Sequence, residues 1–154
     1  MENFPAFDFG NTVLSEIAAP EQDMREDAKA YAVDPEALRF EDQLLTICVL
    51  ESVVSAVVTD PQIRTEVLEG LLHRLKQMQN WSRIEAALLD RRPIYIQAVN
   101  DKVPDEIVWS VSEAFGKFVT GRFDPLVGPY GSSRYVFLVQ QMKKMLAETK
   151  LVAG

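Results

Sequence analysis

The chain has 154 residues, of which 47% are hydrophobic and 25% are charged, and its formal net charge is −7. This balance is typical of a single folded globular domain and argues against a disordered or membrane protein. The acidic charge also argues against duplex nucleic acid and anionic lipid as main ligands, because both would be repelled by such a surface.

The charged residues are unevenly distributed. Residues 1–69 hold 15 acids and 4 bases, whereas residues 116–154 hold 6 bases and 2 acids. In the interpretation we favour, the two ends neutralise each other within the folded domain. In the alternative, the asymmetry guides a charged partner to the surface.

The sequence predicts a cytoplasmic location. The start, MENFPAFDFGN, lacks the basic and then apolar pattern of a secretory signal. The longest apolar run, residues 44–58, is interrupted by Glu51 and is short for a bilayer. Cys48 is the only cysteine, so an internal disulfide is excluded.

The sequence predicts two parts of the chain: an N-terminal arm, residues 1–10, and a single helical domain, residues 11–154. The arm is rich in phenylalanine and too short to form a core of its own. It contains Phe4, Phe7 and Phe9. Two short helices are expected next, over 12–18 and 21–32, with Pro20 between them.

Asp-Pro pairs mark the next two helices. Asp34 and Pro35 have the residue types of an N-cap and a first helical position, and they open a helix over about 35–59. The pair at 60–61 ends it and opens an amphipathic helix over about 61–79. The second half of the first helix is apolar almost all round, which places it at the centre of the fold.

The following segments are less regular. A short helical segment is predicted over 82–90, before Pro93. Residues 94–99 suit either a strand or a helix, and helix is favoured because no second strand is available to pair with. Pro104 opens a helix to about residue 120.

The stretch LVGPYGSSRYVF, residues 126–137, is interpreted as a connection between helices. It lacks the Gly-Lys-Ser/Thr ending of a phosphate-binding loop, and no strand precedes it. Ser132 or Ser133 is predicted to cap a final helix over about 133–149. The alternative is an anion site at this helix N-terminus, formed by Ser132, Ser133 and Arg134.

Together these elements predict an all-α fold. We expect an irregular or orthogonal bundle of about six to eight helices around the central apolar helix at about 35–59.

Residues with catalytic or ligand-binding chemistry are few, and we predict no metal site and no cofactor. A buried Glu51 could act as a general acid or base, but we favour a structural or partly exposed side chain. His73 lies on the polar side of its helix, which is the wrong face for a haem ligand. One histidine and one cysteine exclude a zinc site made only of His and Cys within a single chain.

Two aromatic residues, Trp109 and Phe137, lie opposite the apolar faces of their helices. In the favoured interpretation they pack beneath another part of the chain, for which the phenylalanine-rich arm is the candidate. In the other they anchor a protein–protein interface, with the arm exchanged between subunits.

The sequence therefore favours a non-enzymatic interaction module: an adaptor, a regulatory subunit or a chaperone-like protein. Its expected partner is another protein or a second copy of the chain, bound through Trp109, Phe137 and the phenylalanines of the arm. The alternative is a small-ligand or anion-binding protein, or an enzyme, that uses residues 131–134 together with Glu51.

Overall fold

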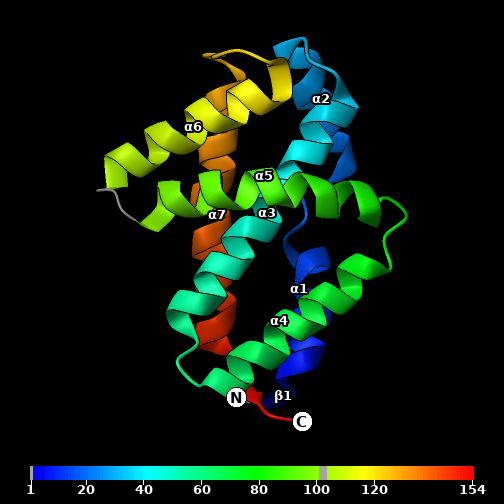
Figure 1. Cartoon of the computed structure of the whole chain (residues 1–154), viewed down its shortest axis with the longest axis vertical. Coiled ribbons are helices and arrows are strands. Elements are labelled where there is room, and N and C mark those ends of the chain that lie inside the picture. Colours follow the sequence, from blue (N-terminus) through cyan, green and yellow to red (C-terminus); the bar gives the residue numbers. More distant parts are fainter. Residues whose placement is uncertain (1, 101–103) are drawn as a thin grey trace.

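The computed structural model describes residues 2–100 and 104–154, which form seven helices and one pair of short parallel strands. The helices cross at steep angles, and the central helix α3 is covered by its neighbours (Figure 1). The predicted all-α class is confirmed. The helices are α1 (Ala6–Ile17), α2 (Glu21–Tyr31), α3 (Pro35–Val57), α4 (Pro61–Lys76), α5 (Trp81–Asn100), α6 (Pro104–Thr120) and α7 (Val127–Glu148).

The central helix and its boundaries follow the sequence prediction. The Asp34 carboxylate accepts a hydrogen bond from the backbone N–H of Glu36, and Asp60 caps α4 in the same way. Residues 44–50 of α3 are all buried. Helix α3 packs against α2, α4, α5, α6 and α7. Its apolar side chains therefore contact neighbouring helices on several sides.

The segment expected as a phenylalanine-rich arm, residues 1–10, contributes a strand and the start of a helix to the fold. Residues Asn3–Pro5 form strand β1, which pairs in parallel with strand β2 (Lys150–Val152) and brings the two chain ends together (Figure 1). Helix α1 then begins at Ala6. Phe9 belongs to the core, with 4% of its surface exposed, and is not available to a partner.

Helix α5 runs through Pro93, so the expected break after residue 90 is wrong, whereas the preference for helix over 94–99 is confirmed. An internal proline costs a helix about 3 kcal/mol through the lost hydrogen bond and a steric clash. Two buried contacts flank it: Arg91 and Tyr95 both bind the carboxylate of Glu41 on α3. These contacts hold both sides of the proline against the core.

Helix α7 begins at Val127, several residues before the predicted start at 133. Its glycines are part of the helix and lie against α6. A Cβ at Gly128 would lie 2.7 Å from the carbonyl oxygen of Ser112, and one at Gly131 would overlap the ring of Phe115. The glycines therefore allow close packing of α6 on α7 and do not form a loop.

The cap of α7 is the Asp124 carboxylate, which accepts hydrogen bonds from the backbone N–H groups of Leu126 (2.8 Å) and Val127 (3.0 Å). We expect Asp124→Ala to reduce the free energy of unfolding by about 1 kcal/mol at neutral pH, the usual effect of losing such a cap. The two N–H groups lower the pKa of Asp124 from its usual value near 3.8. Its contribution is therefore complete above that value and is lost as the pH falls through the folded-state pKa.

Urea unfolding at a series of pH values measures this effect. The difference between the wild type and Asp124→Ala should narrow at acid pH. A difference that stays constant across the acid range would show that the carboxylate charge does not contribute to the cap.

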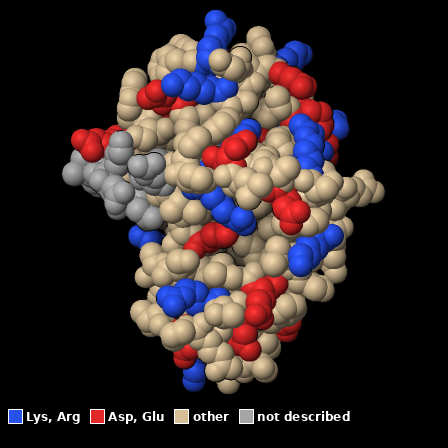
Figure 2. All heavy atoms as spheres, viewed as in Figure 1, with Lys and Arg blue, Asp and Glu red and all other residues tan. Residues whose placement is uncertain are grey.

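Three acids from the first half of the chain form ion pairs with arginines from the second half. Glu41, Glu51 and Asp42 on α3 form ion pairs with Arg91, Arg92 and Arg134. Acidic and basic side chains are interspersed on the face shown in Figure 2. Of these three pairs, Asp42–Arg134 joins the acidic residues 1–69 to the basic residues 116–154, as neutralisation between the two ends predicts, whereas Arg91 and Arg92 come from the middle of the chain. Within the described ranges, no helix has both the length and the apolar character needed to cross a bilayer.

Candidate interaction surface

The corner between α6 and α7 exposes a pair of aromatic rings. Trp109 projects from α6 with 59% of its surface exposed, because the opposite side of that helix carries the buried Val111 and Phe115. The connection to α7 turns at Gly121, whose φ of 79° is in the left-handed region that glycine tolerates. The turn returns the chain along α6 and places the Phe123 ring 5.7 Å from that of Trp109.

A groove of about 400 Å³ lies beside this aromatic pair. Its walls come from α6, the connection and the first turns of α7, and they are mostly apolar. Asp105 is the acidic residue among its lining side chains. The lining residues are Asp105, Val108, Trp109, Ser112, Phe123, Pro125, Pro129 and Ser132.

Exposed apolar side chains are concentrated in this part of the molecule. Among the described residues, twelve large apolar side chains are exposed, and half of them lie on α6, α7 or their connection. These six are Val108, Trp109, Phe123, Leu126, Val136 and Phe137. Val108, Trp109 and Phe123 line the same groove, and apolar surface grouped in this way marks interaction sites more often than scattered single residues do. We call these six residues the α6–α7 surface.

The phenylalanines at the start of the chain do not cover this surface, so the favoured prediction of internal docking is wrong. Phe4 packs edge-on against Phe9, at 6.4 Å between ring centres, and Phe7 lies 5.5 Å from the ring of His73. Phe137 is 45% exposed. Trp109 and Phe137 lie outside the core, as their positions opposite the apolar helix faces predicted. The phenylalanine-rich segment that was expected to cover them lies elsewhere.

Residues 131–134 do not form a helix N-terminus, and the structural basis of the predicted anion site is wrong. Ser132 is buried and donates to the carbonyl oxygen of Pro129 (3.1 Å), while Ser133 lies within α7. Arg134 binds the Asp42 carboxylate at 2.7 Å. At the true start of α7, the Asp124 carboxylate occupies the N–H groups that an anion would need.

Glu51 and His73 each make a polar contact, and neither contact involves residues 131–134. Glu51 is partly exposed and pairs with Arg92 at 3.1 Å, as the favoured interpretation expected. It is nine residues from Asp42 along α3, or about 13 Å at 1.5 Å per residue. His73 is exposed, and its Nδ1 lies 3.2 Å from the Asn11 side-chain oxygen.

Sequence reasoning missed the two buried acids of α3. Glu41 is 2% exposed and accepts hydrogen bonds from the Arg91 guanidinium (2.8 Å) and the Tyr95 hydroxyl (2.7 Å). Asp42, 5% exposed, is held by Arg134. A signal was present: both acids fall three or four residues from Leu38 and Leu45, which share one face of the helix.

Burial affects the titration of this interior. It raises the pKa of Asp42, while the hydrogen bonds from Arg134 act in the opposite direction. Burial and the Glu41 carboxylate raise the pKa of Tyr95. Burial also raises the pKa of the Cys48 thiol to about 12, so this thiol is a poor nucleophile in the folded state.

Comparisons with protein-family models, with curated proteins and with solved structures give no significant match to this chain. Among the residues that the structure describes, no three His, Cys, Asp or Glu side chains are grouped so that they could hold a metal ion.

Proposed function

We propose that this chain is a non-enzymatic protein-interaction module, an adaptor or regulatory subunit, that binds another protein through the α6–α7 surface. The observation that carries the proposal is the exposed Trp109, whose ring lies next to the tilted ring of Phe123 at the edge of an apolar groove. Tryptophan is enriched among the residues that dominate binding energy at interfaces, because its large ring loses much water-exposed area on contact.

The groove also indicates the chemistry of its partner. Its walls are apolar, and Asp105 provides a negative charge at its lining. A partner segment with an apolar side chain to fill the groove and a neighbouring lysine or arginine would match both features. Phe137 lies further along α7 and lines a different hollow with Ile17, Tyr130 and Arg134, so a partner would contact it only through a second part of its surface.

Trp109→Ala is expected to weaken binding about 30-fold or more, since truncating a central aromatic anchor costs about 2 kcal/mol or more. The wild-type chain would be used to capture partners from its native host. The captured protein would then be purified and its Kd measured by calorimetry. The melting temperature of Trp109→Ala should stay within about 2 °C of the wild type, because exposed substitutions affect stability little.

Leu89→Ala is the matched control. Leu89 is 72% exposed on α5 and lies outside the α6–α7 surface, so its removal should leave the Kd unchanged. Equal binding by the two variants would overturn the proposal. Sedimentation equilibrium of the purified chain adds a second test. A wild-type dimer that Trp109→Ala converts to monomers would assign the surface to a second copy and contradict the adaptor role.

A further inference from the structure

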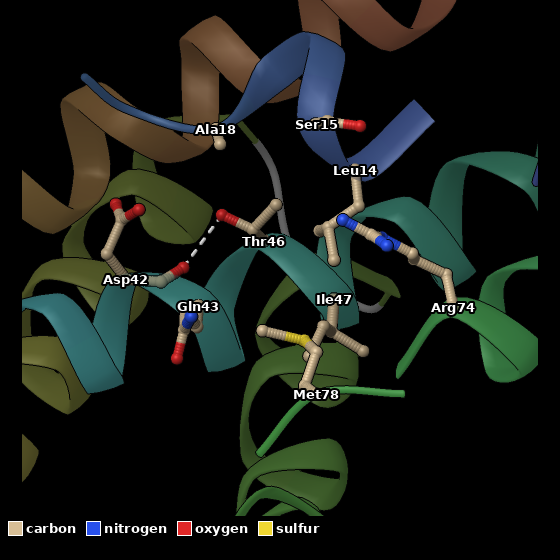
Figure 3. Close-up of a pocket in the computed structure, with 9 residues that line it drawn as sticks. All are labelled: Leu14, Ser15, Ala18, Asp42, Gln43, Thr46, Ile47, Arg74 and Met78. Carbon is tan, nitrogen blue, oxygen red and sulfur yellow. Dashed lines mark hydrogen bonds between the residues drawn. The ribbon is translucent and has the colours of Figure 1, made fainter. Parts of the chain in front are cut away.

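A second cavity, distant in sequence from the α6–α7 surface, lies between α1, α3 and the end of α4 (Figure 3). Its volume is about 240 Å³. The aliphatic side chains of Leu14, Ala18, Ile47 and Met78 form most of its wall. No aromatic ring is among the residues that line it.

The polar side chains of this cavity differ in whether other groups of the chain already bind them. The Asp42 carboxylate is bound by Arg134, and the Thr46 hydroxyl donates to the carbonyl oxygen of Asp42 (2.7 Å). Arg74 differs, because none of the ion pairs in the described part of the chain involves it. Its guanidinium extends from α4 toward Leu14, across the cavity (Figure 3).

We propose that this cavity binds a medium-chain aliphatic monocarboxylate, with the alkyl chain against the aliphatic wall and the carboxylate on Arg74. An arginine guanidinium presents paired N–H donors that match the two oxygens of a carboxylate. One guanidinium balances one carboxylate, whereas a phosphate monoester would bring more negative charge than the cavity can neutralise.

The size and wall of the cavity define the alkyl part of the ligand. Pockets for drug-sized molecules are about 300–1,000 Å³, so a cavity of about 240 Å³ suits a smaller ligand. Without aromatic rings in the wall, an aromatic acid would gain no ring stacking, and a flexible alkyl chain is the better match. Met78 is unbranched and flexible, so it can adapt to the end of such a chain.

Octanoate is the probe for this proposal, titrated by calorimetry into the full-length chain. We expect saturable binding of one octanoate per chain, at least tenfold tighter than that of octanol. Arg74→Gln should weaken octanoate binding about tenfold and leave octanol binding unchanged. Ala18→Leu, which places a larger side chain in the cavity from an exposed position, should weaken both.

Lys76→Gln is the matched control, since it removes the same charge from the same helix at an exposed residue that does not line the cavity. It should bind octanoate as the wild type does. The proposal is overturned if millimolar octanoate shows no saturable binding, if octanol binds equally well, or if Arg74→Gln and Lys76→Gln have the same effect. Because Trp109 lies outside this cavity, Trp109→Ala should also bind octanoate normally.

Discussion

Replacing either Gly10 or Gly70 by alanine is expected to reduce the free energy of unfolding by about 3 kcal/mol, the upper part of the usual range for overpacking a tight contact. Helices α1 and α4 pack closely against each other at these two glycines. A Cβ at Gly10 would overlap the carbonyl oxygen of Val67, and one at Gly70 would overlap that of Phe7. Both obstacles are backbone atoms, so the helices themselves must separate.

Whether the alanine lowers or raises the free energy of unfolding distinguishes a close backbone contact from an exposed glycine. In an exposed helix, replacing glycine by alanine stabilises the fold by about 0.5–1 kcal/mol. Chemical unfolding of each variant, followed by circular dichroism, measures the difference. Gly116→Ala in α6 is the control, because its nearest heavy atom would lie 3.3 Å from the new Cβ and needs only a small adjustment.

The double variant tests whether both glycines serve the same crossing. Once one alanine has separated α1 from α4, the second should cost less, so the two effects should not add. Neutral or stabilising single variants would contradict a backbone contact between these helices.

The parts of the fold that were predictable from sequence are those set by local signals. Asp34 with Pro35 and the Asp-Pro pair at 60–61 fixed helix starts because a cap and its proline act within one turn. The helical periodicity of α6 was equally local, and it separated Trp109 from the core. Such signals are complete within a short stretch of chain.

The errors have a common physical origin in contacts between distant segments. The start of α7 was missed because its glycines suggested a loop, whereas they lie within the helix where it packs closely on Ser112 and Phe115 of α6. Helix α5 continues through Pro93 because Glu41, about fifty residues earlier, binds on either side of it. For α5 no local pattern carries this information, whereas for α7 the pair at 124–125 is the same Asp-Pro signal that opens α3 and α4.

The candidate surface was predicted only in part, for a similar reason. Trp109 and Phe137 were found because each violates a helical pattern. Phe123 and Leu126 lie in a short connection without periodicity, so nothing in the sequence distinguished them from other loop residues. The place of Phe123 beside Trp109 follows from the turn at Gly121, which only the three-dimensional structure shows.

Glu41→Ala is expected to produce the largest loss of stability, about 3–5 kcal/mol, because removing one partner of a buried ion pair leaves the other charge uncompensated. Glu41 accepts from both Arg91 and Tyr95, and the Arg91 guanidinium is only 15% exposed. Its other side lies 3.7 Å from the centre of the Phe118 ring, so little water can replace the lost carboxylate.

Two further variants make the measurement specific. Glu51→Ala is the control, since the Glu51–Arg92 pair has side chains 25% and 39% exposed and should contribute about 1 kcal/mol or less. Glu41→Leu combined with Arg91→Met removes both charges and should recover much of the loss, because apolar side chains often replace a buried ion pair without penalty.

Equal losses for Glu41→Ala and Glu51→Ala in urea unfolding would contradict a buried role for Glu41. A double variant no more stable than Glu41→Ala would assign the loss to Tyr95 and to packing, because the unpaired charge of Arg91 would then contribute little.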